Sequence, residues 1–139
     1  MQSGDKREET RDEQEDARTT VAELRDAVRR FVNERNWAQF HNPKDLSISI
    51  AIEAAELLEE FQWLNAEEVA TLVANSEERA RVAAELADVL IYCLSLSNAM
   101  ELDVSRIVLS KLEANARKYP AEQYQGCFRQ RPSQKRQSA

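Results

Sequence analysis

Glycine occurs only twice in this chain of 139 residues, as Gly4 and Gly126. The long stretch between them therefore lacks the residue on which tight turns and phosphate-binding loops most depend. The same stretch is rich in alanine, leucine, glutamate and arginine, which are strong helix formers. This composition predicts an all-α protein.

The length and the two polar ends predict one domain with short flanking segments. Residues 1–18 mix both signs of charge without apolar periodicity, so we expect them to be disordered. Residues 19–126 carry the apolar periodicity, and about 105 residues are enough for one modest core. Residues 127–139 are basic and polar, and we expect them to form a flexible tail.

Capping and breaking signals divide the predicted domain into helices. Thr20 and Glu23 have the spacing of a capping box, and Asn42 precedes Pro43, so residues 36–46 are expected to connect two helices. The expected caps of the later helices are Asn65, Ser76 and Asp103. Together these signals predict a four-helix bundle with one additional short helix, at about residues 21–35, 45–64, 66–74, 77–100 and 104–119.

Two pairs of acidic residues lie on two of these helices, Glu53 with Glu56 and Glu85 with Asp88. Three residues advance a helix by almost one turn, so each pair projects from one side of its helix. The two helices also match in residue type when one is shifted by 32 positions onto the other. If they face each other, they place four carboxylates close together, and such a group needs a cation.

The residues alone leave two interpretations of these acids open. Glutamate-rich helices usually present a solvated, charged face. In the first acid helix, however, Ile52 and Trp63 lie on the far side of the acids from the main apolar stripe, so apolar residues flank the acids on both sides. Crowded anions in such a place lose solvation and repel one another, which favours protonation or metal binding.

A ferritin-like di-iron protein also carries inward-facing acids on a four-helix bundle, but it uses Glu-x-x-His pairs. His41 is the only histidine of this chain, and it lies in a predicted connection outside both acid helices. The sequence therefore argues against a di-iron site.

Charge, hydropathy and cysteine content exclude further classes. The net charge of −6 argues against a nucleic-acid-binding surface and suits a cation-binding protein. No apolar run approaches the roughly 20 residues of a membrane span. The charged start also lacks a signal-peptide core, so we expect a cytoplasmic protein without a membrane partner. Cys93 and Cys127 lack metal-ligand spacing and are expected to be reduced thiols.

The last predicted helix carries Lys111, Asn115 and Lys118 along one face, at spacings of four and three residues. Taken alone, two cations and an amide on one face indicate a solvated edge. Beside a metal-carboxylate site, the same face could hold phosphate oxygens.

Four ordered sequence blocks resemble one family. The blocks ERNWAQFHNPKDL, LLEEFQWL, ELADVLIY and KLEANARKYP, together with the E-x-x-E pair before the second block, lie within residues 21–126. They resemble the all-α nucleoside triphosphate pyrophosphohydrolases of the MazG-like superfamily, and most of all its dCTP pyrophosphatase branch. The resemblance covers nearly the whole segment that we expect to be ordered.

The resemblance implies an enzyme that converts a (deoxy)nucleoside triphosphate to the monophosphate and pyrophosphate with Mg²⁺ as cofactor. It implies a pyrimidine substrate, dCTP or a modified dCTP. By position, the metal ligands and catalytic acids would be Glu53, Glu56, Glu85 and Asp88. Carboxylates and triphosphate oxygens are the hard ligands that Mg²⁺ prefers.

The resemblance also implies the substrate contacts. Trp37, His41 and Trp63 match positions that line the base pocket, and Tyr92 would lie near the sugar. The residues expected to contact phosphate or sugar are Lys111, Asn115, Tyr119 and, more weakly, Lys118. Val28 departs from the pattern, because vertebrate relatives place a base-pocket histidine there.

We also expect a homo-oligomer, a tetramer built as a dimer of dimers or a simple dimer. Helices with apolar residues on both sides of an acidic stripe have more surface to bury than a chain of this size can cover alone. The resemblance points the same way. The alternative to the enzyme is a non-catalytic helical scaffold that binds partners and retains the fold.

Overall fold

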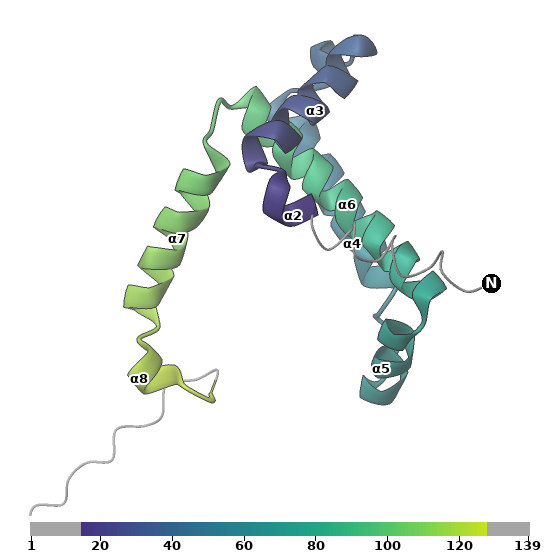
Figure 1. The fold of residues 1–139 in the computed structure, drawn as a ribbon, viewed down its shortest axis with the longest axis vertical. Helices are drawn as coiled ribbons and strands as arrows, with labels where there is room; N and C mark the ends of the chain where they lie inside the picture. The colour runs from purple at the N-terminus through teal and green to yellow at the C-terminus, as the bar shows by residue number, and fades with distance from the viewer. Residues whose placement is uncertain (1–14, 128–139) are drawn as a thin grey trace, which may run out of the picture. The chain divides into compact units, whose positions relative to one another are not determined.

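The computed structural model describes residues 15–127, and over that range it contains helices and no strand (Figure 1). The prediction of an all-α fold is confirmed. Most of the two predicted terminal segments, 1–18 and 127–139, lies outside the described residues. Residues 15–18 are an exception, because they form a short helix where disorder was expected. The elements in chain order are α2 (Glu15–Arg18), α3 (Val21–Glu34), the 3-10 turn η1 (Ala38–Phe40), α4 (Pro43–Glu59), α5 (Ala66–Ala74), α6 (Ser76–Ala99), α7 (Val104–Lys118) and α8 (Ala121–Tyr124).

Side-chain caps fix the starts of the helices much as predicted. The Thr20 hydroxyl accepts a hydrogen bond from the Glu23 N–H, and the Glu23 carboxylate accepts one from the Thr20 N–H, so the capping box at the start of α3 is complete. Asn65 and Glu68 form a second box at the start of α5. Asp103 caps α7 by accepting from the Arg106 N–H.

Three predictions about helix ends are wrong. α4 begins at Pro43 rather than Asp45, because Asn42 is the cap and Pro43 occupies the first turn, where its missing N–H costs nothing. The same helix ends at Glu59 rather than Leu64. α6 is capped by Asn75 rather than Ser76.

α3 and α6 end in the same way, at residues with a left-handed backbone. Asn36 has φ 52° and Glu101 has φ 53°. The next N–H closes the turn in each case, from Trp37 to the Val32 carbonyl and from Leu102 to the Ser97 carbonyl. These 6→1 hydrogen bonds are those of a Schellman motif, which terminates a helix sharply.

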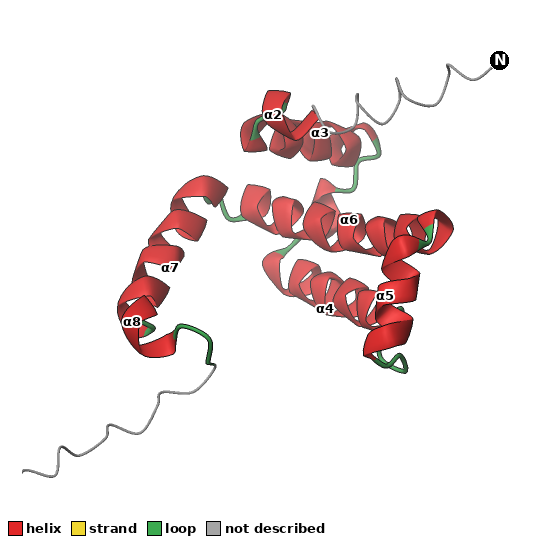
Figure 2. Ribbon diagram, turned by 60° about the horizontal axis from the view of Figure 1, so that its bottom comes forward, coloured by secondary structure: helices red, strands yellow, loops and turns green. Residues whose placement is uncertain are grey.

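The described chain divides into two compact units between Leu102 and Asp103. In the first unit α6 is central, and it packs against α4, α3 and α5 (Figure 2). α4 is its main neighbour. The second unit holds α7 and α8. Only the first unit therefore positions the two acid helices.

Few side chains of the described residues are fully enclosed. The buried apolar residues are Val32, Leu46 and Leu72. Many large apolar residues remain exposed, and they occur on α3, α4, α6 and α7. Such a small enclosed core leaves a large apolar surface available for packing against another protein surface.

The composition of α6 bears on the expectation that no apolar run is long enough to span a membrane. α6 is long and apolar enough, by length and composition alone, to cross a membrane, with a mean hydropathy of 1.4 over its most apolar 18 residues. These properties are weak evidence for a membrane span. α6 is also the helix around which the first unit packs, and a central helix of a helical domain has the same length and composition.

Candidate metal and nucleotide site

The packing of α4 against α6 brings three carboxylates together. Glu53 and Glu56 project from α4 and Glu85 from α6, and one carboxylate oxygen from each lies within 4.8 Å of the other two. Glu53 and Glu85 are half-buried, whereas Glu56 is exposed. Asp88, one turn beyond Glu85, is exposed and lies outside this group of three.

The carboxylate group is electrostatically unfavourable without a cation. Burial is the main cause that raises the pKa of Glu53 and of Glu85, and the negative charges of Glu56 and Asp88 raise both pKa values further. The Glu85 Oε2 atom is buried and has no hydrogen-bond partner within the described part of the chain. A buried oxygen without a donor, in a group of hard oxygen ligands, fits a divalent cation such as Mg²⁺.

Another glutamate, Glu60 at the C-terminal end of α4, has a positively charged partner. Glu60 forms an ion pair with Arg81 of α6, in which its Oε2 atom accepts from Nη2 at 3.1 Å and from Nε at 3.4 Å. Glu60 follows Glu56 by one turn, and Arg81 precedes Glu85 by one turn. Sequence reasoning missed this pair, although the two four-residue spacings from the predicted acids were a usable signal.

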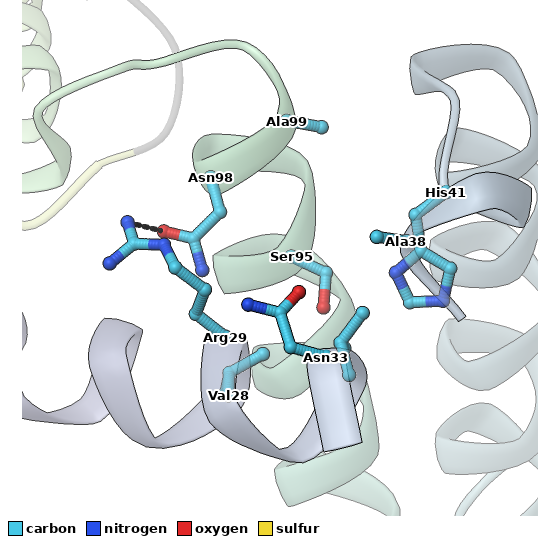
Figure 3. A pocket seen from close by; sticks show the side chains of 9 residues that line it. Val28, Arg29, Asn33, Ala38, His41, Ser95, Asn98 and Ala99 are labelled. Carbon is cyan, nitrogen blue, oxygen red and sulfur yellow. Dashed lines mark hydrogen bonds between the residues drawn. The ribbon is translucent and has the colours of Figure 1, made fainter. Parts of the chain in front are cut away.

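A cavity of about 190 Å³ lies beside the other half of α6, between α3 and the segment around η1 (Figure 3). Its apolar wall consists of Val28, Val32, Ala38 and Ala99. Its polar lining consists of Arg29, Asn33, His41, Ser95 and Asn98. An apolar cavity with a few convergent polar groups is the usual form of a small-molecule site.

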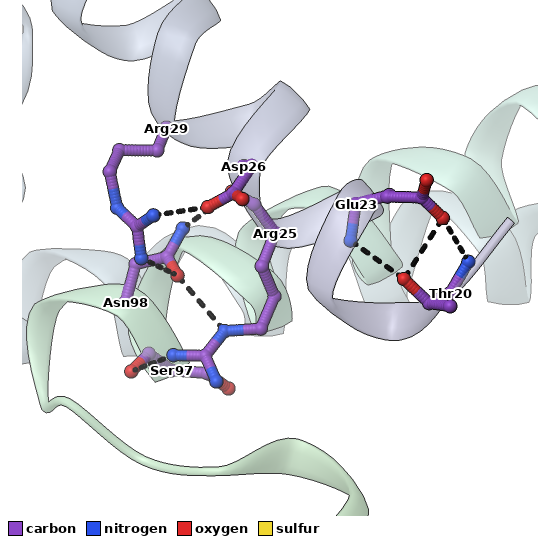
Figure 4. Close-up of polar contacts among 7 residues, drawn as sticks. All are labelled: Thr20, Glu23, Arg25, Asp26, Arg29, Ser97 and Asn98. Atoms are coloured by element: carbon purple, nitrogen blue, oxygen red, sulfur yellow. Dashed lines mark hydrogen bonds and ion pairs between the residues drawn. The ribbon is translucent and has the colours of Figure 1, made fainter.

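A paired polar network joins α3 to α6 next to this cavity (Figure 4). The Asn98 Oδ1 atom accepts from Arg25 Nε and from Arg29 Nη2, each at 3.1 Å. Asn98 Nδ2 donates to the Arg25 carbonyl at 3.0 Å. Arg25 also donates to the Ser97 carbonyl, and Arg29 forms an ion pair with Asp26. Asn98 therefore has a structural role and little capacity left for a ligand.

Of the four residues expected to contact the base and sugar, only one lines this cavity in the described part of the chain. His41 lines the cavity, whereas Trp37 does not. The Trp37 ring packs edge-to-face on Phe31, with 5.8 Å between ring centroids. Trp63 lies in the turn after α4 and is 85% exposed. Tyr92 is half-buried on α6, one turn beyond Asp88.

The residues expected to contact phosphate all belong to the second unit. Lys111 lies in a shallow apolar groove of α7 with Ile107, Val108 and Leu112. Tyr119 packs edge-to-face on Tyr124, and Lys118 Nζ lies 5.1 Å from the centre of the Tyr119 ring. Asn115 is half-buried, and its backbone carbonyl accepts from the Tyr119 N–H.

Asn33 and Ser95 were not among the predicted site residues. Both line the cavity, from α3 and α6. Asn33 follows Val28 by five residues on α3, and Ser95 follows Asp88 by two turns on α6. The only signal in the sequence for these two residues was their helical position relative to Val28 and to Asp88.

Residues 48–129 match the MazG-like family. The chain is 39% identical over 102 residues to dCTP pyrophosphatase 1 from Homo sapiens, a match that covers 73% of this chain and 60% of the relative. It is 36% identical over 107 residues to dCTP pyrophosphatase 1 from Rattus norvegicus, covering 77% of this chain and 63% of the relative. The chain thus spans less than two thirds of the length of these curated relatives.

A solved structure has the same fold. The crystal structure of a pyrophosphatase from Archaeoglobus fulgidus aligns with a TM-score of 0.65 and 44% sequence identity, and the alignment covers 72% of this chain and 92% of that one.

Proposed function

Because the chain belongs to the MazG-like family, we propose that it is a Mg²⁺-dependent hydrolase that splits a (deoxy)nucleoside triphosphate into the monophosphate and pyrophosphate. The proposed substrate is dCTP or a dCTP modified on the base, as the names of the curated relatives suggest. The observation that carries the proposal is the group of three converging carboxylates with its buried, unpaired Glu85 oxygen.

The proposed metal ligands are Glu53, Glu56 and Glu85, with Asp88 of the next turn of α6 as the fourth acid. Their oxygen atoms are hard ligands of the kind that Mg²⁺ prefers, and no histidine or cysteine is needed. When bound, the cation supplies charge neutralisation for the triphosphate and for the pyrophosphate that leaves.

The remaining chemistry falls to the side chains. One α4 acid that is not fully used as a ligand, Glu53 or Glu56, orients the attacking water and accepts its proton as general base. The cavity beside α3 receives the base, with His41 at its polar lining. Trp37, Trp63 and Tyr92 are further proposed base and sugar contacts. The proposed phosphate or sugar contacts of α7 and its end are Lys111, Asn115, Lys118 and Tyr119.

We further propose that the enzyme is a homo-oligomer, a tetramer built as a dimer of dimers. Only 11% of the most apolar window of α6 is buried within one chain, and Leu86, Leu90 and Ile91 on this helix are exposed. A second copy would cover such a surface. Sedimentation velocity at micromolar concentration should give a mass above that of one chain, and a monomer mass would contradict the proposal. The cytoplasmic location stays a prediction.

The activity is tested by measuring pyrophosphate release from all canonical dNTPs and from 5-methyl-dCTP, with Mg²⁺ and with EDTA. We expect Mg²⁺-dependent release with the highest kcat/KM for a cytosine nucleotide. A folded protein that releases no pyrophosphate from any triphosphate would favour the non-catalytic scaffold, which the exposed apolar surface also suits. The highest kcat/KM for a purine would refute the substrate assignment and leave the hydrolase assignment intact.

A further inference from the structure

Ser95 and Ser97 are two buried serines on α6, and their hydroxyls differ in whether they form a hydrogen bond within the chain. Ser95 is 5% exposed and Ser97 is 8% exposed. The Ser97 hydroxyl donates to the Cys93 carbonyl at 2.9 Å, which is the usual way in which a helix satisfies a buried serine. The Ser95 hydroxyl has no hydrogen-bond partner among residues 15–127, and it lines the cavity between α3 and α6.

The Ser95 hydroxyl opens onto this cavity, where a ligand or a water molecule can complete its hydrogen bonding. Asn33 is an exposed residue that lines the same cavity from α3, and its side-chain amide has no partner in the described part of the chain. Figure 3 shows Asn33, Ser95 and His41 converging on the cavity from α3, from α6 and from the connection before α4. Three polar groups with free hydrogen-bonding capacity thus meet around apolar walls.

The position of Ser95 relative to the acids suits a nucleotide. Ser95 follows Asp88 by seven residues, or two helical turns, so both residues lie on the same side of α6 about 10 Å apart along its axis. A nucleotide whose phosphates are held near Asp88 and Glu85 would extend its base along α6 toward Ser95. The cavity volume of about 190 Å³ suits a single-ring base.

We propose that Ser95 is a specificity-determining residue, whose hydroxyl hydrogen-bonds the polar edge of a cytosine base together with the Asn33 amide. This inference rests on the proposed hydrolase function. Cytosine presents an amino donor beside a ring-nitrogen acceptor. An amide oxygen accepts from the first and a serine hydroxyl donates to the second. The apolar residues Val28 and Val32 cover the remainder of the ring.

The two serines provide a matched pair of variants, Ser95→Ala and Ser97→Ala. Ser95→Ala should weaken binding of dCMP, measured by calorimetry in EDTA, and raise KM for dCTP, in each case by about tenfold. The change in kcat should be smaller, because a base contact is made equally in the ground state and the transition state. Ser97→Ala should leave dCMP binding and KM unchanged.

The melting temperatures should show the opposite pattern. Ser97→Ala removes a formed hydrogen bond and should lower Tm, whereas Ser95→Ala removes an unpaired hydroxyl and should leave Tm equal to or above that of the wild type. Ser95→Thr, which keeps the hydroxyl, should retain more of the affinity for dCMP than Ser95→Ala.

The proposal is overturned if Ser95→Ala binds dCMP as tightly as the wild type, if Ser97→Ala shows the same loss of affinity, or if the wild type binds no dCMP. A failure of the proposed function looks different, because it appears as an absence of pyrophosphate release by the wild type. The calorimetric measurement does not depend on hydrolysis, so the two failures are distinguishable.

Discussion

Two groups of polar residues at the opposite ends of α6 differ in whether the chain itself supplies their partners. In the second half, toward α3, Asn98 accepts from two arginines and donates to a carbonyl, and the Ser97 hydroxyl is also paired. In the first half, toward α4, Glu85 has a buried oxygen without a partner and lies within 4.8 Å of two further carboxylates. Both halves belong to one continuous helix.

Polar residues that the chain itself pairs stabilise the fold, whereas polar residues without a partner can bind a ligand. A paired network stabilises the packing of two helices and requires nothing more from outside the chain. A group of like charges that lose solvation destabilises the folded state until a cation binds. The second situation is typical of functional sites, where groups with shifted pKa values cluster.

The largest expected effect comes from removing one charge of the carboxylate group. Glu85→Gln keeps the shape of the side chain but removes an anionic ligand, so kcat/KM for pyrophosphate release should fall by at least about a hundredfold. In the absence of metal the variant should melt at or above the wild-type temperature, because a repulsive charge is gone. Glu59→Gln, an exposed acid of α4, is the matched control and should behave like the wild type.

Near-normal activity of Glu85→Gln at saturating Mg²⁺ would show that the ligand assignment is wrong. A large loss of metal-free stability in the same variant would contradict the view that this half of α6 is under electrostatic stress.

Asn98→Ala should have the opposite profile, because it breaks the paired network. Arg25 and Arg29 lose their shared acceptor, and the free energy of unfolding should fall by about 1–3 kcal/mol in urea titrations. The stabilisation gained by adding Mg²⁺ should be unchanged. Arg30→Ala, at an exposed position of α3, is the control. If Asn98→Ala and Arg30→Ala have equal effects, the network does not hold α3 to α6.

The pH dependence of metal-free stability should be a smaller effect. The pKa values of Glu53 and Glu85 are raised above 4.5 in the folded protein. The folded state therefore binds more protons than the unfolded state between pH 4.5 and the raised values, so these two groups make stability fall as pH rises through that window. Below pH 4.5 both states are protonated and the penalty disappears.

Urea unfolding in EDTA, from pH 4.5 to about 7, should therefore show a more negative slope of stability against pH for the wild type than for Glu53→Gln/Glu85→Gln. Saturating Mg²⁺ should reduce the difference between the two proteins. Parallel curves in EDTA would mean that the two carboxyl groups titrate as they do in the unfolded chain.

Local signals in the sequence were enough to predict most of the helices. The capping box at Thr20 and the cap at Asn65 are short-range patterns, and the structure forms both as expected. The end of α4 was not predictable in the same way. Phe61 and Leu64 continue the apolar periodicity, yet α4 ends at Glu59. After that point the N–H groups of Phe61 and Leu64 donate to carbonyls three residues earlier, as in a 3-10 turn. At the start of α6, Asn75 and Ser76 are adjacent residues that both favour the cap position, so the pattern could not choose between them.

The site shows the same division between local and tertiary information. The i, i+3 spacing of the acids indicated that each pair shares a helix face, and the structure brings three of the four acids together. The ion pair of Glu60 with Arg81 depends on how α4 and α6 pack, and the four-residue spacings from the predicted acids are only a weak signal of it. Whether Ser95 or Ser97 faces a cavity depends on tertiary packing in the same way.

The most direct test of the central claim is a Mg²⁺ titration of the wild type, Glu59→Gln and Glu85→Gln by isothermal titration calorimetry, with and without a non-hydrolysable dCTP analogue. We expect saturable Mg²⁺ binding to the wild type and to Glu59→Gln, and strongly weakened binding to Glu85→Gln. If the wild type binds no Mg²⁺ under either condition, or if Glu85→Gln binds it as tightly as the wild type, the carboxylate group of α4 and α6 is not a metal site.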